Sequence, residues 1–193
     1  MIRMLSPILL LLPVAAQAAP VAIDVRGADG KPLAGAVVTV EVAGAVTRPP
    51  ARAFQVEQRD VQFQPRVIIV PVGATVGFPN RDRVRHHVYS FSKPKTFDLK
   101  LYGRDDTRSV TFDKPGIVAL GCNIHDAMSG FVFVTATPYA AQTDEAGRVT
   151  FDVPAGRATI RVWHPTIRAK DNMLTNAATV APTGLVSHLT ITR

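Results

Sequence analysis

The sequence has 193 residues, of which 47% are hydrophobic and 19% charged, so a disordered chain and a collagen-like fibre are excluded. The 22 basic and 15 acidic residues give a formal charge of +7, which favours acidic partners or surfaces. Fifteen prolines and 13 glycines among many Val and Thr predict an all-β fold, with room for one large domain or two small ones.

The first residues predict a secretory signal peptide spanning residues 1–18. Arg3 supplies a positive start, residues 8–16 form a short apolar run, and Ala16-Gln17-Ala18 has the small-x-small pattern of a cleavage site. The run is about half as long as the ~20 apolar residues that a membrane span needs. No later segment is long and apolar enough either, so we expect no membrane span. The cationic, Ala-rich leader indicates export to a bacterial periplasm.

Two segments flank the middle of the chain and alternate apolar with polar residues. Residues 21–40 predict two strands joined by the turn Asp29-Gly30, and residues 143–162 predict further strands with Gly-bearing turns. Residues 167–184 are weakly patterned, which predicts a loop or a short helix. The flanks are therefore predicted to be rich in strands as far as residue 162.

The middle of the chain begins with a strand, a turn and a second strand over residues 68–80. In the segment that follows, strand alternation places Val84, His86 and Val88 on one face and leaves His87 on the other. The face with two valines is the core side, so His86 is predicted to point inward and His87 outward.

The only cysteine of the chain, Cys122, stands in the pattern C-x2-H-x2-M with His125 and Met128. An exported protein tends to pair or lose its cysteines, so a single one calls for a reason. Zinc would prefer more thiolates or carboxylates, whereas a thiolate, an imidazole and a weak thioether suit copper. A blue copper site needs one more histidine for its His2Cys plane, and the inward-pointing His86 is the candidate.

These segments resemble the plastocyanin and amicyanin group of cupredoxins, which are Greek-key β-sandwiches with one type 1 copper. Residues 72–80 resemble the family's G-x-x-V-x-F-x-N strand pair, and the interval from Asn80 to His86 matches that of amicyanins. Residues 112–128 resemble the family's ligand loop, with the short amicyanin-type spacing. The resemblance covers residues 61–134. Two stretches within it are also similar to periplasmic proteins labelled as methylamine-utilisation proteins.

The resemblance implies a role for each matching residue. His86 and His125 are the equatorial nitrogen ligands of the copper, Cys122 is the thiolate ligand, and Met128 is the weak axial ligand. The resemblance also implies that Asn80 ties the ligand-bearing strands together, as groups around a metal site often do. The alternative for Asn80 is an ordinary turn asparagine.

The sequence departs from the family pattern at three positions. Leu120 stands where the family usually has an aromatic residue, and the prolines that amicyanin-type loops carry around the second histidine are replaced by Ile124 and Asp126. Two alternatives stay open for Asp126: its charge lowers the reduction potential, or it faces solvent and does little.

The flanks together resemble a transthyretin-like, carboxypeptidase-regulatory-type β-sandwich with an immunoglobulin-like architecture. The implied organisation is a signal peptide at 1–18, a discontinuous flanking domain at 19–48 and 138–193, and a cupredoxin domain at 49–137 inserted into it. The alternative is a single elongated sandwich with extra strands.

The expected function is a periplasmic electron carrier and not an enzyme, because the type 1 ligand set leaves no equatorial position for substrate. One alternative is a periplasmic copper carrier or sensor, and another is an adhesion or saccharide-binding module with bound copper. The expected partner is an acidic redox protein that docks beside His125 through the basic residues of 81–108; no nucleic-acid partner is expected. The sequence leaves the oligomeric state open.

Overall fold

The computed structural model describes residues 18–48 and 53–191. The predicted all-β fold is confirmed: the described residues form strands joined by turns, with one short 3-10 turn. Among them, no helix is long and apolar enough to cross a bilayer. The predicted signal peptide lies outside the described residues, apart from Ala18, with which the first strand begins.

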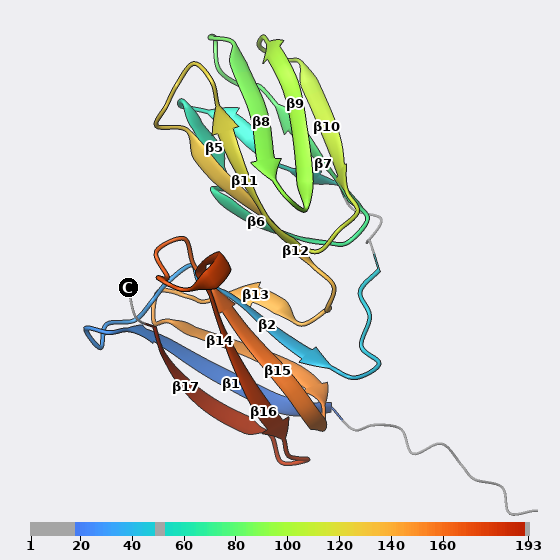
Figure 1. Cartoon of the computed structure of the whole chain (residues 1–193), viewed down its shortest axis with the longest axis vertical. Coiled ribbons are helices and arrows are strands. Elements are labelled where there is room, and N and C mark those ends of the chain that lie inside the picture. Colours follow the sequence, from blue (N-terminus) through green and yellow to red (C-terminus); the bar gives the residue numbers. More distant parts are fainter. Residues whose placement is uncertain (1–17, 49–52, 192–193) are drawn as a thin grey trace, which may run out of the picture.

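Strands from the two ends of the chain form one sandwich, called the flank sandwich below (Figure 1). Its strands are β1 (Ala18–Gly27), β2 (Val37–Val42), β13 (Ala140–Gln142), β14 (Arg148–Pro154), β15 (Gly156–Trp163), β16 (Met173–Val180) and β17 (Leu185–Ile191), with the 3-10 turn η1 (Lys170–Asn172) before β16. One sheet has the order β14-β1-β17 and the other β13-β2-β15-β16. Alternate β1 side chains, including Val21, Ile23 and Val25, are buried between them.

The turn at Asp29-Gly30 forms as predicted, with Gly30 at a φ of 75°, but the flanking strands are not hairpin partners. β1 pairs with β14 and β17, whereas β2 pairs with β13 and β15 in the opposite sheet. Between them Leu33 and Ala36 are buried in the core. The chain therefore crosses from one sheet to the other, because burying these side chains outweighs local hairpin pairing.

The prediction of a loop or short helix at 167–184 is mostly wrong. Residues 173–180 form β16, which pairs with the whole of β15 from Trp163↔Met173 to Gly156↔Val180. β16 is an edge strand in which only Val180 is buried. An edge strand with so little buried surface carries almost no hydrophobic pattern in its sequence, which explains the error.

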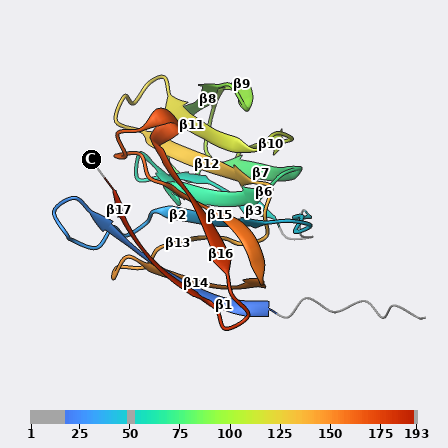
Figure 2. The ribbon, with the colours of Figure 1, turned by 60° about the horizontal axis from the view of Figure 1, so that its bottom comes forward.

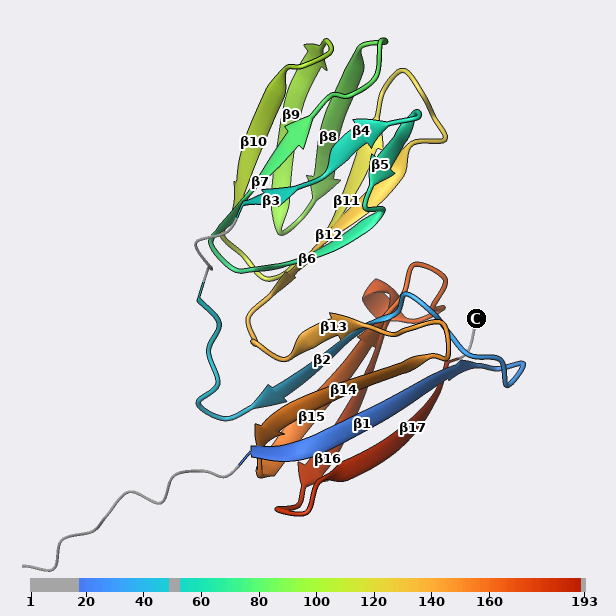
Figure 3. The same ribbon diagram turned by 180° about the vertical axis from the view of Figure 1, so that it is seen from behind.

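The middle of the chain forms the second sandwich, called the site sandwich below. Its strands are β3 (Phe54–Gln55), β4 (Glu57–Arg59), β5 (Gln62–Gln64), β6 (Val67–Pro71), β7 (Ala74–Pro79), β8 (His86–Ser92), β9 (Lys95–Tyr102), β10 (Thr107–Phe112), β11 (Gly116–Cys122) and β12 (Ser129–Thr135). A five-stranded sheet of order β6-β12-β11-β8-β9 faces the sheet β10-β7-β3, and β4 and β5 form a separate hairpin. Figure 3 shows this hairpin on the side of the β11–β12 loop.

The predicted strand, turn and strand at 68–80 are β6 and β7, with Gly73 at a φ of 85° in the turn between them. The two strands lie in different sheets, since β6 pairs with β12 and β7 with β10 and β3. Buried aromatic residues of both sheets fill the space between them, including Phe78 and Phe112 of the three-stranded sheet and Tyr102 of the five-stranded sheet. This turn therefore links the two layers that hold the site.

The two sandwiches contact each other through a small apolar cluster around Trp163. The Trp163 ring, at the end of β15, lies 5.0 Å from the Phe131 ring and 6.0 Å from the Phe133 ring, measured between centroids. Val37 and Met173 complete the flank side of this cluster, while Val67, Ile69 and Ile117 complete the site side. Figure 2 shows the site sandwich stacked on the flank sandwich.

Among the described residues, no strand of the flank sandwich pairs with a strand of the site sandwich. Each sandwich also has its own cluster of buried apolar residues. On these observations we propose that residues 49–137 form a domain inserted into a discontinuous domain of residues 19–48 and 138–193.

Candidate metal centre

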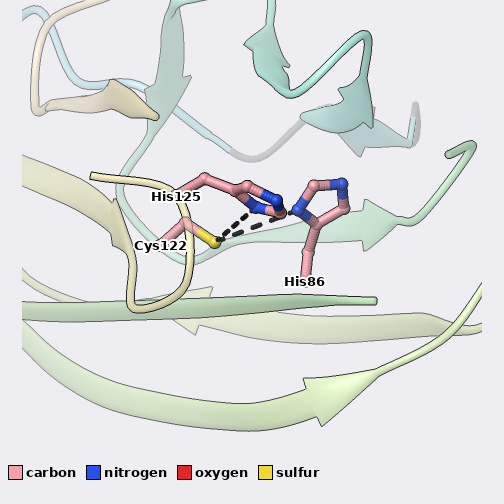
Figure 4. Close-up of side chains that lie close together, drawn as sticks. All are labelled: His86, Cys122 and His125. Atoms are coloured by element: carbon pink, nitrogen blue, oxygen red, sulfur yellow. Dashed lines mark hydrogen bonds between the residues drawn. The ribbon is translucent and has the colours of Figure 1, made fainter. Parts of the chain in front are cut away.

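Three metal-binding side chains meet between the loops at one end of the site sandwich (Figure 4). Cys122 is the last residue of β11, His86 is the first residue of β8, and His125 lies in the loop that follows Cys122. The Cys122 Sγ atom lies 3.9 Å from Nδ1 of His86 and 3.8 Å from Nδ1 of His125. All three donor atoms lie within 4.8 Å of one another.

The three residues differ in their access to solvent. His86 has an exposed fraction of 0% and Cys122 is also buried, whereas His125 is partly exposed. The two imidazole rings lie with their centroids 5.0 Å apart. The centre is therefore closed to water on the His86 side and reaches the surface at His125.

Met128 is buried in the same apolar cluster as Cys122. Its backbone N–H donates a hydrogen bond of 2.9 Å to the carbonyl oxygen of His125, which closes the loop into a turn. The loop therefore brings Met128 into the apolar core that also contains Cys122. Its role as an axial ligand stays a prediction.

Asp82 contacts the centre, although the sequence analysis gave it no role there. Its Oδ2 atom lies 2.8 Å from Nε2 of His86. Partial burial acts to raise the pKa of the Asp82 carboxyl, but hydrogen bonds from the Val61 N–H, the His86 ring and the Asp60 N–H outweigh it and hold the pKa below its usual value. An ionised Asp82 accepts a hydrogen bond from Nε2–H of His86, which leaves the Nδ1 lone pair of His86 facing Cys122.

Asn80 holds the segment between β7 and β8 in place. Its Nδ2 atom donates to the carbonyl oxygens of Val84, at 2.9 Å, and Tyr102, at 3.3 Å. Its Oδ1 atom accepts a hydrogen bond of 2.9 Å from the backbone N–H of Asp82. Asn80 is fully buried and joins the residues on both sides of His86, which favours the positioning role over an ordinary turn asparagine.

The alternation predicted for residues 84–89 holds from His86 onward and fails before it. His86 and Val88 are buried, while His87 faces the other side, where its Nε2 atom lies 2.5 Å from Oδ1 of Asp98. Val84 is 46% exposed, so its predicted inward position is wrong. It precedes the first residue of β8 and lies in the bend that Asn80 stabilises, where strand alternation does not apply.

Asp126 is exposed, which favours the alternative that it faces solvent. Leu120, which stands where an aromatic residue was expected, is buried in the core of the site sandwich. A pattern that would have revealed Asp82 is a carboxylate four residues before an inward-pointing histidine.

The donor set fits a single copper ion. Metal–ligand bonds of about 2.0–2.3 Å place the donors of a trigonal plane roughly 3.5–4 Å apart. The two measured distances from the Cys122 Sγ atom agree with this spacing. Two imidazoles and one thiolate are the equatorial set of a blue copper site, with a thioether as its weak axial ligand.

The chain is similar to several solved structures over about half of its length. A copper-containing nitrite reductase (NirK) from Thermus scotoductus SA-01 is 29% identical, with a TM-score of 0.42 over 49% of this chain and 25% of its own. A purple cupredoxin from Nitrosopumilus maritimus is 23% identical, with a TM-score of 0.39 over 42% of this chain and 99% of its own. Amicyanin from Paracoccus versutus is 22% identical, with a TM-score of 0.41 over 50% of this chain and 98% of its own.

The likeness is to part of this chain in each case, and this chain spans a quarter of the length of the nitrite reductase. No protein-family model and no curated protein sequence matches the chain.

The position of Asp82 predicts that its replacement weakens metal binding. In Asp82→Asn the side chain keeps its size but loses the charge that holds Nε2–H of His86, so we expect copper affinity to fall about 10–100-fold. Competition with a chelator of known affinity measures the loss. Asp126→Asn is the matched control, because Asp126 is exposed. An equal loss in both variants would contradict a specific role for Asp82.

Proposed function

We propose that the chain is a periplasmic type 1 copper protein that carries single electrons, with His86, Cys122, His125 and Met128 as the ligands of one copper. The observation that carries this proposal is the convergence of His86, Cys122 and His125, with Met128 buried in the same apolar cluster as Cys122. Copper bound there would supply a one-electron couple.

The residues of the chain serve such a couple by holding their geometry. Asn80 and Asp82 fix His86 from the β7–β8 segment, while the backbone bond between Met128 and His125 fixes the opposite loop. A rigid donor set changes little when one electron is gained or lost. The proposed ligands fill the equatorial plane and give substrate no place there, so we propose a carrier rather than an enzyme.

His125 is the proposed point of electron exchange. It is the partly exposed member of the cluster, and Figure 1 shows the β7–β8 and β11–β12 loops at the end of the site sandwich away from the flank sandwich. Three loops beside the site carry exposed apolar residues: Val61, whose N–H donates to Asp82, Val84, two residues before His86, and Ile124, next to His125. A partner that approaches this end would meet His125 within an apolar surface.

An optical spectrum with a redox titration of the copper-loaded chain tests the proposal. We expect intense visible absorption from the thiolate–Cu(II) bond and a reversible one-electron couple. A colourless copper adduct would contradict the type 1 site. A coloured site that releases copper on reduction would favour a copper carrier or sensor.

The two aromatic residues considered for a saccharide-binding surface, Trp163 and Tyr139, are not well exposed, which does not favour that alternative. Trp163, one of two aromatic candidates in the C-terminal flank, is buried between the sandwiches. Tyr139, the other, is only partly exposed and packs against the core of the flank sandwich.

The proposed partner is an acidic redox protein. The eight basic residues of 81–108, which would face it, differ in whether they form ion pairs. Half of them form ion pairs: Arg81 with Glu57, Lys95 with Asp113, Lys100 with Asp98 and Arg104 with Asp105. Arg83 and Arg85 lie three residues and one residue before His86, are exposed, and form no ion pair with a described residue. The positive charge available beside the site therefore includes this pair.

Arg83 and Arg85 predict salt-dependent electron exchange with an anionic reagent. We expect oxidation of the reduced chain by hexacyanoferrate(III) to slow as salt screens the charges, and to slow about 10-fold at low salt in Arg83→Glu/Arg85→Glu. Stopped-flow absorption measures the rates. Arg157→Glu, an exposed site on the flank sandwich, is the control that should keep most of the rate. Equal slowing in both variants would leave only the overall charge as the cause.

A further inference from the structure

The turn between β4 and β5 has an unusual backbone. Its two residues, Asp60 and Val61, both lie in the left-handed region, with φ values of 55° and 56°. A two-residue hairpin turn favours this conformation, and Asn-Gly or Asp-Gly sequences usually supply it. A valine there is strained, because its branched side chain crowds the backbone. Contacts with the rest of the structure therefore have to hold this turn in place.

Both amides of the turn bind one carboxylate. The N–H of Asp60 donates to Oδ1 of Asp82 at 2.8 Å, and the N–H of Val61 donates to Oδ2 at 3.0 Å. The two amides lie beyond the last residue pair of the hairpin, so no strand partner takes them. Oδ2 of Asp82 also lies 2.8 Å from Nε2 of His86. The carboxylate therefore links the turn to the buried histidine of the candidate metal centre.

The hairpin is fixed along the segment that carries Asp82. Gln58 of β4 forms a parallel bridge with Asn80, and both residues are fully buried. The N–H of Arg81 donates a hydrogen bond of 2.9 Å to the carbonyl oxygen of Gln58. The Arg81 side chain forms an ion pair with Glu57 at 3.3 Å. The turn is thus attached to a hairpin that cannot shift independently of the β7–β8 segment.

The hairpin also contacts the strand that follows the second ligand-bearing loop (Figure 3). A Cβ atom on Gly130, two residues after Met128, would lie 3.0 Å from Cβ of Phe63, so the Phe63 side chain rests against the Gly130 backbone. Phe63 is buried in the same apolar cluster as Met128. The N–H of Phe131 donates to the carbonyl oxygen of Arg66, just after β5, at 2.8 Å. The hairpin is therefore held on both sides of the candidate metal centre.

We propose that the Asp60–Val61 turn positions His86 for copper through the Asp82 carboxylate, which makes these two turn residues positioning residues of the metal centre. The inference rests on the proposed copper site and assigns a role to residues that touch none of its ligands. A carboxylate that accepts hydrogen bonds from three fixed groups keeps one orientation, and the His86 ring bound to it keeps Nδ1 directed at Cys122. The two amide bonds to an ionised carboxylate offset the strain at Val61.

Hydrogen exchange of the isotope-labelled, metal-free chain, followed by NMR, tests the link between the turn and Asp82. We expect the amides of Asp60 and Val61 to exchange about 10-fold faster or more in Asp82→Ala, because the carboxylate that binds them is removed. The amide of Gly44, in an exposed turn of the flank sandwich with a φ of 77°, is the internal reference and should not change. Unchanged exchange at Asp60 and Val61 would overturn the proposal.

Copper affinity, measured by competition with a chelator, tests the link to the metal centre. Proline cannot adopt the φ of Val61 and has no N–H, so we expect Val61→Pro to lower the affinity about 10-fold. Val61→Gly keeps the N–H and allows the left-handed φ, and it should keep the affinity. Gly44→Pro disrupts a turn of similar φ in the flank sandwich and is the matched control. Equal losses in Val61→Pro and Val61→Gly would show that the side chain acts and not the amide, which would overturn the proposal.

A double-mutant cycle separates positioning through Asp82 from a general loss of structure. If the turn acts through this carboxylate, Val61→Pro should cost less than about 2-fold in copper affinity when Asp82 is already replaced in Asp82→Asn. A further loss of about 10-fold in that background would mean that the two effects add, and the proposed route through Asp82 would be wrong.

The same measurements distinguish failure of this inference from failure of the proposed function. A colourless copper adduct of the unaltered chain would contradict the type 1 electron carrier, whereas the exchange rates and the cycle would still report on the turn. Additive losses in a chain that keeps its colour would overturn the positioning role of the turn and leave the electron carrier intact.

Discussion

Replacing Cys122 with serine is expected to abolish the intense visible absorption of the copper-loaded chain. Cys122 supplies the thiolate of the cluster with His86 and His125, and a serine hydroxyl cannot supply the thiolate-to-copper charge transfer. Absorption spectra of the copper-loaded variant and of the unaltered chain measure the effect. Retention of the colour in Cys122→Ser would contradict the proposed site.

The two neighbouring histidines provide a matched pair for the same measurement. His86 is buried with its Nδ1 atom 3.9 Å from the Cys122 Sγ atom, whereas His87 is on the opposite face and bonded to Asp98. We expect His86→Ala to lose the colour and His87→Ala to keep it. The reverse result would show that the strand is out of register by one residue, which would move each side chain to the other face.

Replacing Trp163 with alanine is expected to lower the free energy of unfolding by about 3–5 kcal/mol, the usual range for a buried Trp or Phe. Trp163 is buried and packs against Phe131 and Phe133, so the truncation leaves a cavity between the sandwiches. Urea denaturation of the metal-free chain, followed by circular dichroism, measures the change. Because the chain has two sandwiches, two transitions are to be fitted if they separate.

Phe91→Ala is the matched control for this variant. Phe91 is also aromatic and lies on the face of the five-stranded sheet that Trp163 contacts elsewhere, but it is exposed. We expect its truncation to change the free energy of unfolding by about 0.5 kcal/mol or less, as for most surface positions. Similar losses in both variants would show that Trp163 does not hold the sandwiches together.

The all-β fold and the local features of the candidate site could be read from the sequence because they depend on short-range order. The spacing of Cys122, His125 and Met128 places three donors in one short loop. The alternation of β8 is a property of every strand, so it separated His86 from His87 without any knowledge of the partners of the strand.

The tertiary structure alone decided which segments meet. It placed the Asp82 carboxylate within hydrogen-bond distance of Nε2 of His86. It also placed β1 and β2 in different sheets, although one turn connects them. It also formed β16 from a segment without a clear pattern and buried Trp163 between the sandwiches. Each of these features depends on a contact between residues or surfaces whose relative position in space is set by the whole fold. Periodicity reports only the side of a strand that is buried, and it does not report the partner that covers that side.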